Sequence, residues 1–105
     1  MSKQILFEIL TPIDLIVEVS RRRWEVIISI KHPAMLGAET LVGEVLSNPD
    51  QIRRSRRDSK VLLFYKAQRP KRWICAVVKR LNDKATLVTA YPTNAIKVGD
   101  VIWTR

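Results

Sequence analysis

Apolar residues between positions 38 and 46 recur at the spacing of an amphipathic helix. Ala38, Leu41, Val42, Val45 and Leu46 occupy positions i, i+3, i+4, i+7 and i+8, which places their side chains on one helical face. The segments on both sides are rich in β-branched and aromatic residues instead. A single amphipathic helix between β-prone runs can bury its apolar face against a sheet, so the pattern predicts an α+β fold.

The region before this helix, residues 4–31, reads as β-structure. Residues 4–10 form a short β-prone run that Thr11-Pro12 ends, because proline cannot continue an interior ladder. Residues 14–19 and 24–30 are β-branched and flank the polar group of residues 20–23. This pattern predicts a β-hairpin with a basic tip.

His32-Pro33 breaks the strand pattern, and the main helix is predicted over about residues 34–47. Asn48, Pro49 and Asp50 then have the chemistry of a new helix start, namely an N-cap, a proline at the first position and an acid in the first turn. The sequence therefore predicts a short second helix, so that helical structure extends over residues 34–57.

Three further strands are predicted in succession, over residues 60–67, 73–81 and 84–91, with a last short strand at 101–103. A two-residue turn at Asn82-Asp83 would pair Thr89 with Ala76 and Tyr91 with Ile74. Together these elements predict one domain spanning residues 1–105. We expect an antiparallel sheet of about five to six strands, a meander over 60–103, and the two helices packed on the sheet.

The charge balance favours a polyanionic partner. Nineteen Lys and Arg residues stand against ten Asp and Glu, which gives a net charge of +9 and a pI near 10.3, in the range of nucleic-acid-binding domains. Arginine pairs bidentately with phosphate. The predicted nucleic-acid-binding residues are the arginine run and the basic turn after residue 67, namely Arg53, Arg54, Arg56, Arg57, Arg69, Lys71 and Arg72.

Cys75 is the only cysteine, so a disulfide framework or a cysteine metal cluster is not expected. No apolar run is long enough for a membrane span, and the N-terminal residues lack the pattern of a signal peptide. We therefore expect a cytoplasmic protein without a membrane partner, a metal or another cofactor.

His32 is the only histidine, and imidazole is the side chain that most readily acts as a general acid or base near neutral pH. Thr89 and Tyr91 place two hydroxyl groups on one face of a predicted strand. Metal-free RNA cleavage needs a base, an acid and cations or hydroxyls around the phosphate. These residues could supply such groups if they converge.

Several segments between His32 and Trp103 resemble the phage- and toxin-associated branch of the barnase/EndoU/colicin/RelE (BECR) superfamily of metal-independent ribonucleases. They are the histidine at the helix start, the Asn48-Pro49-Asp50 break with Ser55 and Asp58 following, Tyr65-Lys66 at a strand end, and the segment TAYPT at residues 89–93. The resemblance implies a sheet-and-helix ribonuclease with a catalytic site at His32, Lys66, Thr89 and Tyr91.

The resemblance also implies RNA as the substrate and an acidic antitoxin or immunity protein as a partner, as for the toxin of a toxin–antitoxin pair or a phage-derived nuclease domain. Two other readings of the residues stay open. One is a non-catalytic nucleic-acid-binding module of the same fold. The other is an accessory domain whose basic face meets an acidic partner.

Overall fold

The computed structural model describes residues 4–97 and 99–105, and its strands join into one mixed sheet. The N-terminal half contains β1 (Ile5–Leu10), β2 (Ile16–Ser20), α1 (Arg21–Val26), the π-helical turn η1 (Ile27–Lys31), the 3-10 turn η2 (Pro33–Met35) and α2 (Glu39–Ser47). The C-terminal half contains β3 (Gln51–Arg54), β4 (Val61–Arg69), β5 (Arg72–Leu81), β6 (Lys84–Thr93) and β7 (Asp100–Thr104).

The described residues form seven strands in the order β1-β2-β6-β5-β4-β3-β7. The pairs are antiparallel except β2 with β6, which run parallel from Ile16↔Lys84 to Glu18↔Thr86. The prediction of an antiparallel sheet with five to six strands was therefore wrong. The fold is a mostly-sheet α+β structure in which a β1–β2 hairpin joins the meander through a parallel contact.

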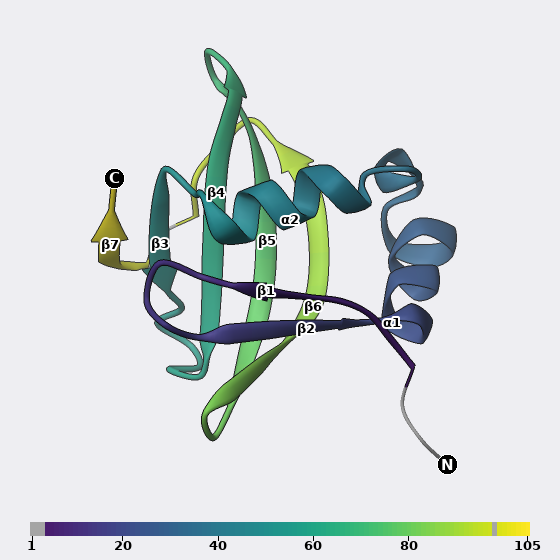
Figure 1. Cartoon of the computed structure of the whole chain (residues 1–105). Coiled ribbons are helices and arrows are strands. Elements are labelled where there is room, and N and C mark those ends of the chain that lie inside the picture. Colours follow the sequence, from purple (N-terminus) through teal and green to yellow (C-terminus); the bar gives the residue numbers. More distant parts are fainter. Residues whose placement is uncertain (1–3, 98) are drawn as a thin grey trace.

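Helix α2 and the β1–β2 hairpin lie on the same side of strands β4–β6 (Figure 1). The buried face of α2 contains Val42, Val45 and Leu46, which confirms the apolar face predicted from the sequence. The helix begins at Glu39 rather than at residue 34, because residues 33–35 form the 3-10 turn and Gly37 then takes a φ of +80°. That left-handed conformation favours glycine and interrupts the helix.

Residues 24–30 are helical, so the predicted strand and its hairpin with residues 14–19 were wrong. The Ser20 side chain caps α1 by accepting a hydrogen bond of 3.1 Å from the Arg23 N–H. Trp24 and Ile27, three residues apart, are both buried in the core. As one helical face, Trp24 and Ile27 pack into the core while Ile30 stays exposed, so tertiary packing overrides the strand propensity of this segment.

Residues 51–54 form β3 between β4 and β7, so the predicted second helix was also wrong. The backbone N–H of Asp50 donates to the Tyr65 carbonyl at 2.8 Å, and its carbonyl accepts from the Arg105 N–H at 3.0 Å. Ile52 is buried. Partners far along the chain satisfy this backbone, and local helix-start chemistry cannot reveal them.

Strands β4, β5 and β6 form an antiparallel meander as predicted, but the meander does not extend to residue 103, because β7 pairs with β3 at the far edge of the sheet. The register of β5 with β6 also differs from the prediction by one residue. Val77 pairs with Thr89 and Val78 with Leu87, which leaves Val88 as a bulge. Tyr91 consequently pairs with Cys75, not with Ile74. A shift of one residue exchanges the two faces of a strand. The bulge therefore turns Thr89 and Tyr91 away from the α2 side, where Ala85 and Leu87 remain in the core.

Candidate functional site

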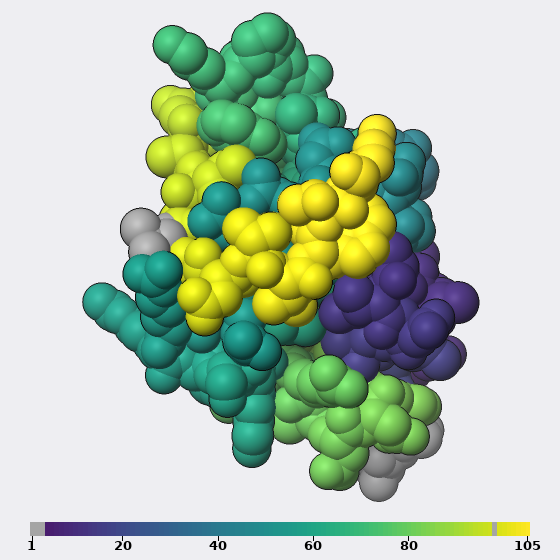
Figure 2. All heavy atoms as spheres, turned by 90° about the vertical axis from the view of Figure 1, so that its left-hand side faces the viewer, coloured from purple at the N-terminus to yellow at the C-terminus, as the bar shows by residue number. Residues whose placement is uncertain are grey.

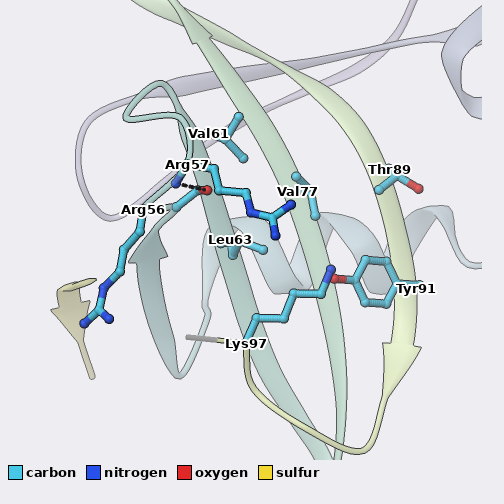
Figure 3. A pocket seen from close by; sticks show the side chains of 9 residues that line it. Arg56, Arg57, Val61, Leu63, Val77, Thr89, Tyr91 and Lys97 are labelled. Carbon is cyan, nitrogen blue, oxygen red and sulfur yellow. Dashed lines mark hydrogen bonds between the residues drawn. The ribbon is translucent and has the colours of Figure 1, made fainter. Parts of the chain in front are cut away.

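The sheet face opposite α2 carries a hollow of about 630 Å³ (Figure 3). Cross-strand pairing sets its floor, because Leu63 pairs with Val77 and Val77 with Thr89. Val61 extends the apolar floor, and the loops after β3 and β6 supply the polar walls. The full lining comprises Ser55, Arg56, Arg57, Val61, Leu63, Val77, Thr89, Tyr91 and Lys97.

Two cations reach over the apolar floor from different loops. Arg57 extends across the sheet above Leu63 and Val77, while Lys97 extends toward Tyr91 (Figure 3). The Lys97 ammonium lies 5.2 Å from the centroid of the Tyr91 ring. Within the described part of the chain, neither Arg57 nor Lys97 forms an ion pair with a carboxylate. The hollow therefore holds positive charge without a compensating anion from the protein.

A turn orients Arg57. Its backbone N–H donates to the Ser55 hydroxyl at 3.2 Å, an interaction typical of serine turns. Before the turn, the Ser55 N–H donates to the Val61 carbonyl at 2.9 Å. The loop thus stays tied to the edge of β4, with the Arg57 side chain over the sheet.

The hydroxyl of Tyr91 is buried and has no hydrogen-bond partner among the described residues. Figure 3 shows it pointing over the floor, toward the side from which Lys97 approaches. Burial, together with the nearby Cys75 thiol, raises the pKa of Tyr91 far above its usual value. The hydroxyl is therefore protonated at neutral pH and can donate a hydrogen bond to an acceptor that enters the hollow.

Thr89 also has a buried hydroxyl without a partner in the described structure. Its side chain lines the hollow, but the hydroxyl points away from Arg57 and Lys97 (Figure 3). A threonine hydroxyl can turn inward by rotating about χ1 between staggered positions. As the structure stands, Thr89 shapes the wall of the hollow.

Tyr65 fixes the loop that carries Lys97. Its hydroxyl accepts a hydrogen bond of 3.0 Å from the backbone N–H of Lys97. Tyr65, Cys75 and Tyr91 lie side by side across three strands, because Cys75 pairs with both tyrosines. Burial raises the pKa of Tyr65 to about 12 and also raises the pKa of the Cys75 thiol. This neutral, buried row supports the cationic end of the hollow.

His32 lies at the border of the hollow, next to Tyr91. The centroids of the two rings are 5.2 Å apart, and the ring planes are inclined by 35°. The His32 N–H donates to the Ile27 carbonyl at 2.7 Å, and its carbonyl accepts from the Met35 N–H at 2.9 Å. The backbone on both sides of His32 is thus held in place, and its imidazole is half-buried beside the Tyr91 ring.

Three predicted site residues lie elsewhere. The Lys66 ammonium donates to the Asn48 carbonyl at 3.0 Å on the α2 side of the sheet. Arg53 bonds to the Gln51 side chain and the Gly99 carbonyl, at 2.6 and 3.3 Å. Arg54 is exposed and lies on the side opposite to Arg53, because the two are adjacent in β3. The arginine run is therefore divided between two faces.

The remaining predicted cations are also dispersed. Arg56 lines the hollow, but its guanidinium extends toward β7, where it lies 3.5 Å from Asp100. Arg69, Lys71 and Arg72 lie at the β4–β5 turn and do not line the hollow. Arg72 donates to the Asn94 side chain at 2.6 Å.

The sequence reasoning did not assign Ser55 to the site and missed Lys97. Lys97 follows an irregular segment with no periodic pattern, and only the long-range bond to Tyr65 brings it to the hollow. One feature of the sequence could have suggested Lys97. It follows closely after the predicted strand that carries the Thr89 and Tyr91 hydroxyls, so it belongs to the loop that begins at the end of that strand. No pattern in the sequence indicates that Lys97 lines the same hollow as Arg57, which lies forty positions earlier.

Among the described residues, no group of three or more His, Cys, Asp or Glu side chains could hold a metal ion. No helix in the same residues is long and apolar enough to cross a membrane.

Fold and site together define a class: a small α+β protein with a hollow on the sheet face opposite α2. In that hollow, Arg57 and Lys97 have no carboxylate partner among the described residues. Comparison with models of known protein families, with curated proteins and with solved structures finds no match in any of the three.

Proposed function

We propose that the hollow binds a phosphodiester of RNA and that the chain is a small ribonuclease whose own side chains perform the cleavage. One observation carries the proposal: Arg57 and Lys97 lack carboxylate partners and border the same apolar floor as the unpaired Tyr91 hydroxyl. Such a site can bind a ligand that has negative charge for the two cations and a hydrogen-bond acceptor for the hydroxyl. A phosphate has both.

The apolar floor adds a preference for a nucleotide over a free phosphate. Val61, Leu63 and Val77 offer a surface that a sugar or base covers while its phosphate meets the cations. The net charge of +9 attracts a polyanion from a distance.

The geometry suggests a role for each group in cleavage. His32, at the border, would accept the proton of the ribose 2′-hydroxyl, whose oxygen then attacks the phosphorus. Arg57 and Lys97 would stabilise the charge that develops on the phosphate oxygens. Tyr91, which is neutral, would donate a hydrogen bond to the same phosphate. The 5′-oxygen would take a proton from water as it leaves, and the resulting hydroxide would take back the proton that His32 accepted. The products are a 2′,3′-cyclic phosphate and a 5′-hydroxyl end.

A second candidate, a non-catalytic RNA-binding module, is favoured by one observation. His32 is not among the residues that line the hollow, although its ring lies 5.2 Å from that of Tyr91, which does line it. RNA held at Arg57 and Lys97 is therefore bound by residues of the hollow that do not include His32. For both candidates, the ribonuclease and the binding module, we also propose a cytoplasmic location and an acidic protein partner.

Cleavage of a single-stranded RNA oligonucleotide with chelator present tests the proposal. We expect cyclic-phosphate products, and none when the scissile ribose is 2′-deoxy. General acid–base catalysis contributes about 10² to 10⁴ in rate. His32→Ala should therefore reduce cleavage about 100-fold or more and change RNA affinity by only a few fold.

Two results separate the candidates. Binding without cleavage by the unmodified protein would leave the binding module in place of the ribonuclease. An affinity for RNA that does not fall when Arg57 and Lys97 are both replaced by Gln would contradict the assignment of the hollow in either form.

A further inference from the structure

The two edge strands of the sheet differ in how they are covered. Helix α2 runs alongside β1 on the side away from β2 (Figure 1), and Gly43 of α2 faces Ile9 of β1. Strand β7 lies on the outside of the molecule, as the yellow residues of Figure 2 show. Val101 is 50% exposed and Ile102 36% exposed. The β7 segment DVIWT also lacks the lysine and proline that commonly protect an edge.

A bulge in β7 gives this edge an unusual order of faces. Trp103 pairs with Ile52, which is buried on the α2 side, and Val101 pairs with Arg53 on the hollow side. Residues two apart in a regular strand share a face. Here the irregularity at Ile102 places Val101 and Trp103 on opposite faces.

The ends of β7 complete the pattern. Asp100 pairs with Arg54 and so lies on the α2 side, whereas Thr104 pairs with Gln51 and lies on the hollow side. Arg105 follows Thr104 on the opposite face, and its guanidinium bonds to Asn48 at the end of α2. The two ends of the segment therefore match when it is reversed: Asp100 and Arg105 lie on the α2 side, and Val101 and Thr104 lie on the hollow side.

We propose that two copies of this chain pair through β7, antiparallel, with the twofold axis between Ile102 and Trp103. In this register Asp100 lies opposite Arg105 of the second copy, and Val101 lies opposite its Thr104, so like faces meet. A shift by one residue would bring opposite faces together. The pairing joins the two sheets into one, and opposite charges meet at both ends of the new ladder.

The charged partners are available for this pairing. The 3.5 Å contact of Asp100 with Arg56 joins side chains that are both more than half exposed, and such pairs exchange partners at little cost. All bonds of the Arg105 guanidinium to Asn48 and Asp50 use Nη2. Its Nε and Nη1 can therefore reach Asp100 of the second copy.

One strand pair is a small interface, and two molecules of net charge +9 repel each other. The dimer should therefore be weak, forming in the micromolar to millimolar range and strengthening as salt screens the repulsion. Strand β1 is the less open edge, because α2 runs alongside it and Gly43 of α2 faces Ile9.

Sedimentation of the whole chain across that concentration range tests the proposal. We expect a monomer–dimer equilibrium that Ile102→Lys weakens about tenfold or more, because an edge lysine opposes strand pairing. Leu10→Lys is the matched control, since it adds the same charge to an exposed leucine on β1. It should leave the equilibrium unchanged within about twofold. Circular dichroism verifies that both variants fold.

A charge exchange tests the register itself. Asp100→Arg leaves cations at both ends of the strand, and Arg105→Asp leaves anions at both ends. Each variant alone should remain monomeric, because like charges face each other at both ends. Mixed in equal amounts, the two variants should form a heterodimer, since both end pairs are then opposite in charge.

Three results would overturn the proposal. They are a chain that remains monomeric at millimolar concentration and high salt, a dimer that Leu10→Lys weakens instead of Ile102→Lys, and a mixture of the two charge variants that forms no heterodimer. The second result would place the second copy on β1.

Discussion

At the scale of residues, the row formed by Tyr65, Cys75 and Tyr91 links the stability of the fold to the site. Burial raises the pKa of all three groups, because it disfavours their charged forms. The same row places the Tyr91 hydroxyl over the floor and holds the loop of Lys97 through Tyr65. Loss of a proton from this row should therefore weaken both the fold and the hollow.

The free energy of unfolding should fall as pH rises above about 10. Each tyrosine has a higher pKa in the folded than in the unfolded chain, so its stabilising contribution is complete below pH 10. It is lost as pH rises through the folded pKa, which for Tyr65 is about 12. The slope should approach about 1 kcal/mol per pH unit for each tyrosine. Urea unfolding between pH 8 and pH 11 measures it.

Tyr65→Phe provides the control for this pH dependence. It removes the acceptor of the Lys97 N–H, so stability at pH 8 should fall by about 1 kcal/mol. Above pH 10 its decline should be shallower than that of the parent protein. An unchanged slope would show that Tyr65 does not titrate with unfolding.

At the scale of elements, close backbone approach determines where the β6–β7 loop meets β3. A Cβ built on Gly99 would lie 2.8 Å from the Arg54 carbonyl oxygen and 3.5 Å from the Arg53 Cβ. The Gly99 carbonyl also accepts a hydrogen bond from Arg53. Only glycine lets the loop lie this close to β3, and the loop carries Lys97.

Gly99→Ala should lower the free energy of unfolding by about 1 to 3 kcal/mol, because the backbone must move to relieve the contact. Gly43→Ala is the comparison. Its new methyl would lie 3.5 Å from Ile9 Cδ1, an ordinary contact, and alanine favours the helix by about 1 kcal/mol. Chemical denaturation should therefore give opposite signs for the two variants. Equal effects of one sign would contradict the account of Gly99.

At the scale of the whole molecule, the positive charge is dispersed over the surface. At the hollow, Arg57 and Lys97 have no carboxylate partner among the described residues. Arg56, Lys79, Lys84 and Arg105 each lie within 4.0 Å of a carboxylate. The general charge should attract RNA, while Arg57 and Lys97 position it. Salt dependence separates these two contributions, because it counts the phosphates that are contacted directly.

Removing both hollow cations should reduce the salt dependence of RNA affinity. For single strands the slope of log affinity against log salt is about 0.7 per phosphate contact. Arg57→Gln with Lys97→Gln should therefore lower its magnitude by about 1.4. Arg69→Gln with Lys71→Gln makes the same charge change at the β4–β5 turn and should lower the slope by less. Equal changes for both pairs, measured by filter binding, would indicate binding through general charge alone.

Local patterns in the sequence determined the α2 face, the three strands of the meander and the excess of positive charge. These features depend on the spacing of neighbouring residues and on composition, and both can be read directly from the sequence. Tyr91 and His32 were identified from residue type, and the structure brings their rings together.

Only the tertiary structure decided the helical state of residues 24–30, the strand at 51–54, and the face on which Tyr91 lies. Trp24 and Ile27 become helical because a core is there to bury them, and β3 exists because β4 and β7 satisfy its backbone. The one extra residue, Val88, places the residues that follow it in β6 on the face opposite to the predicted one. Long-range pairing sets such registers, and no local spacing encodes it.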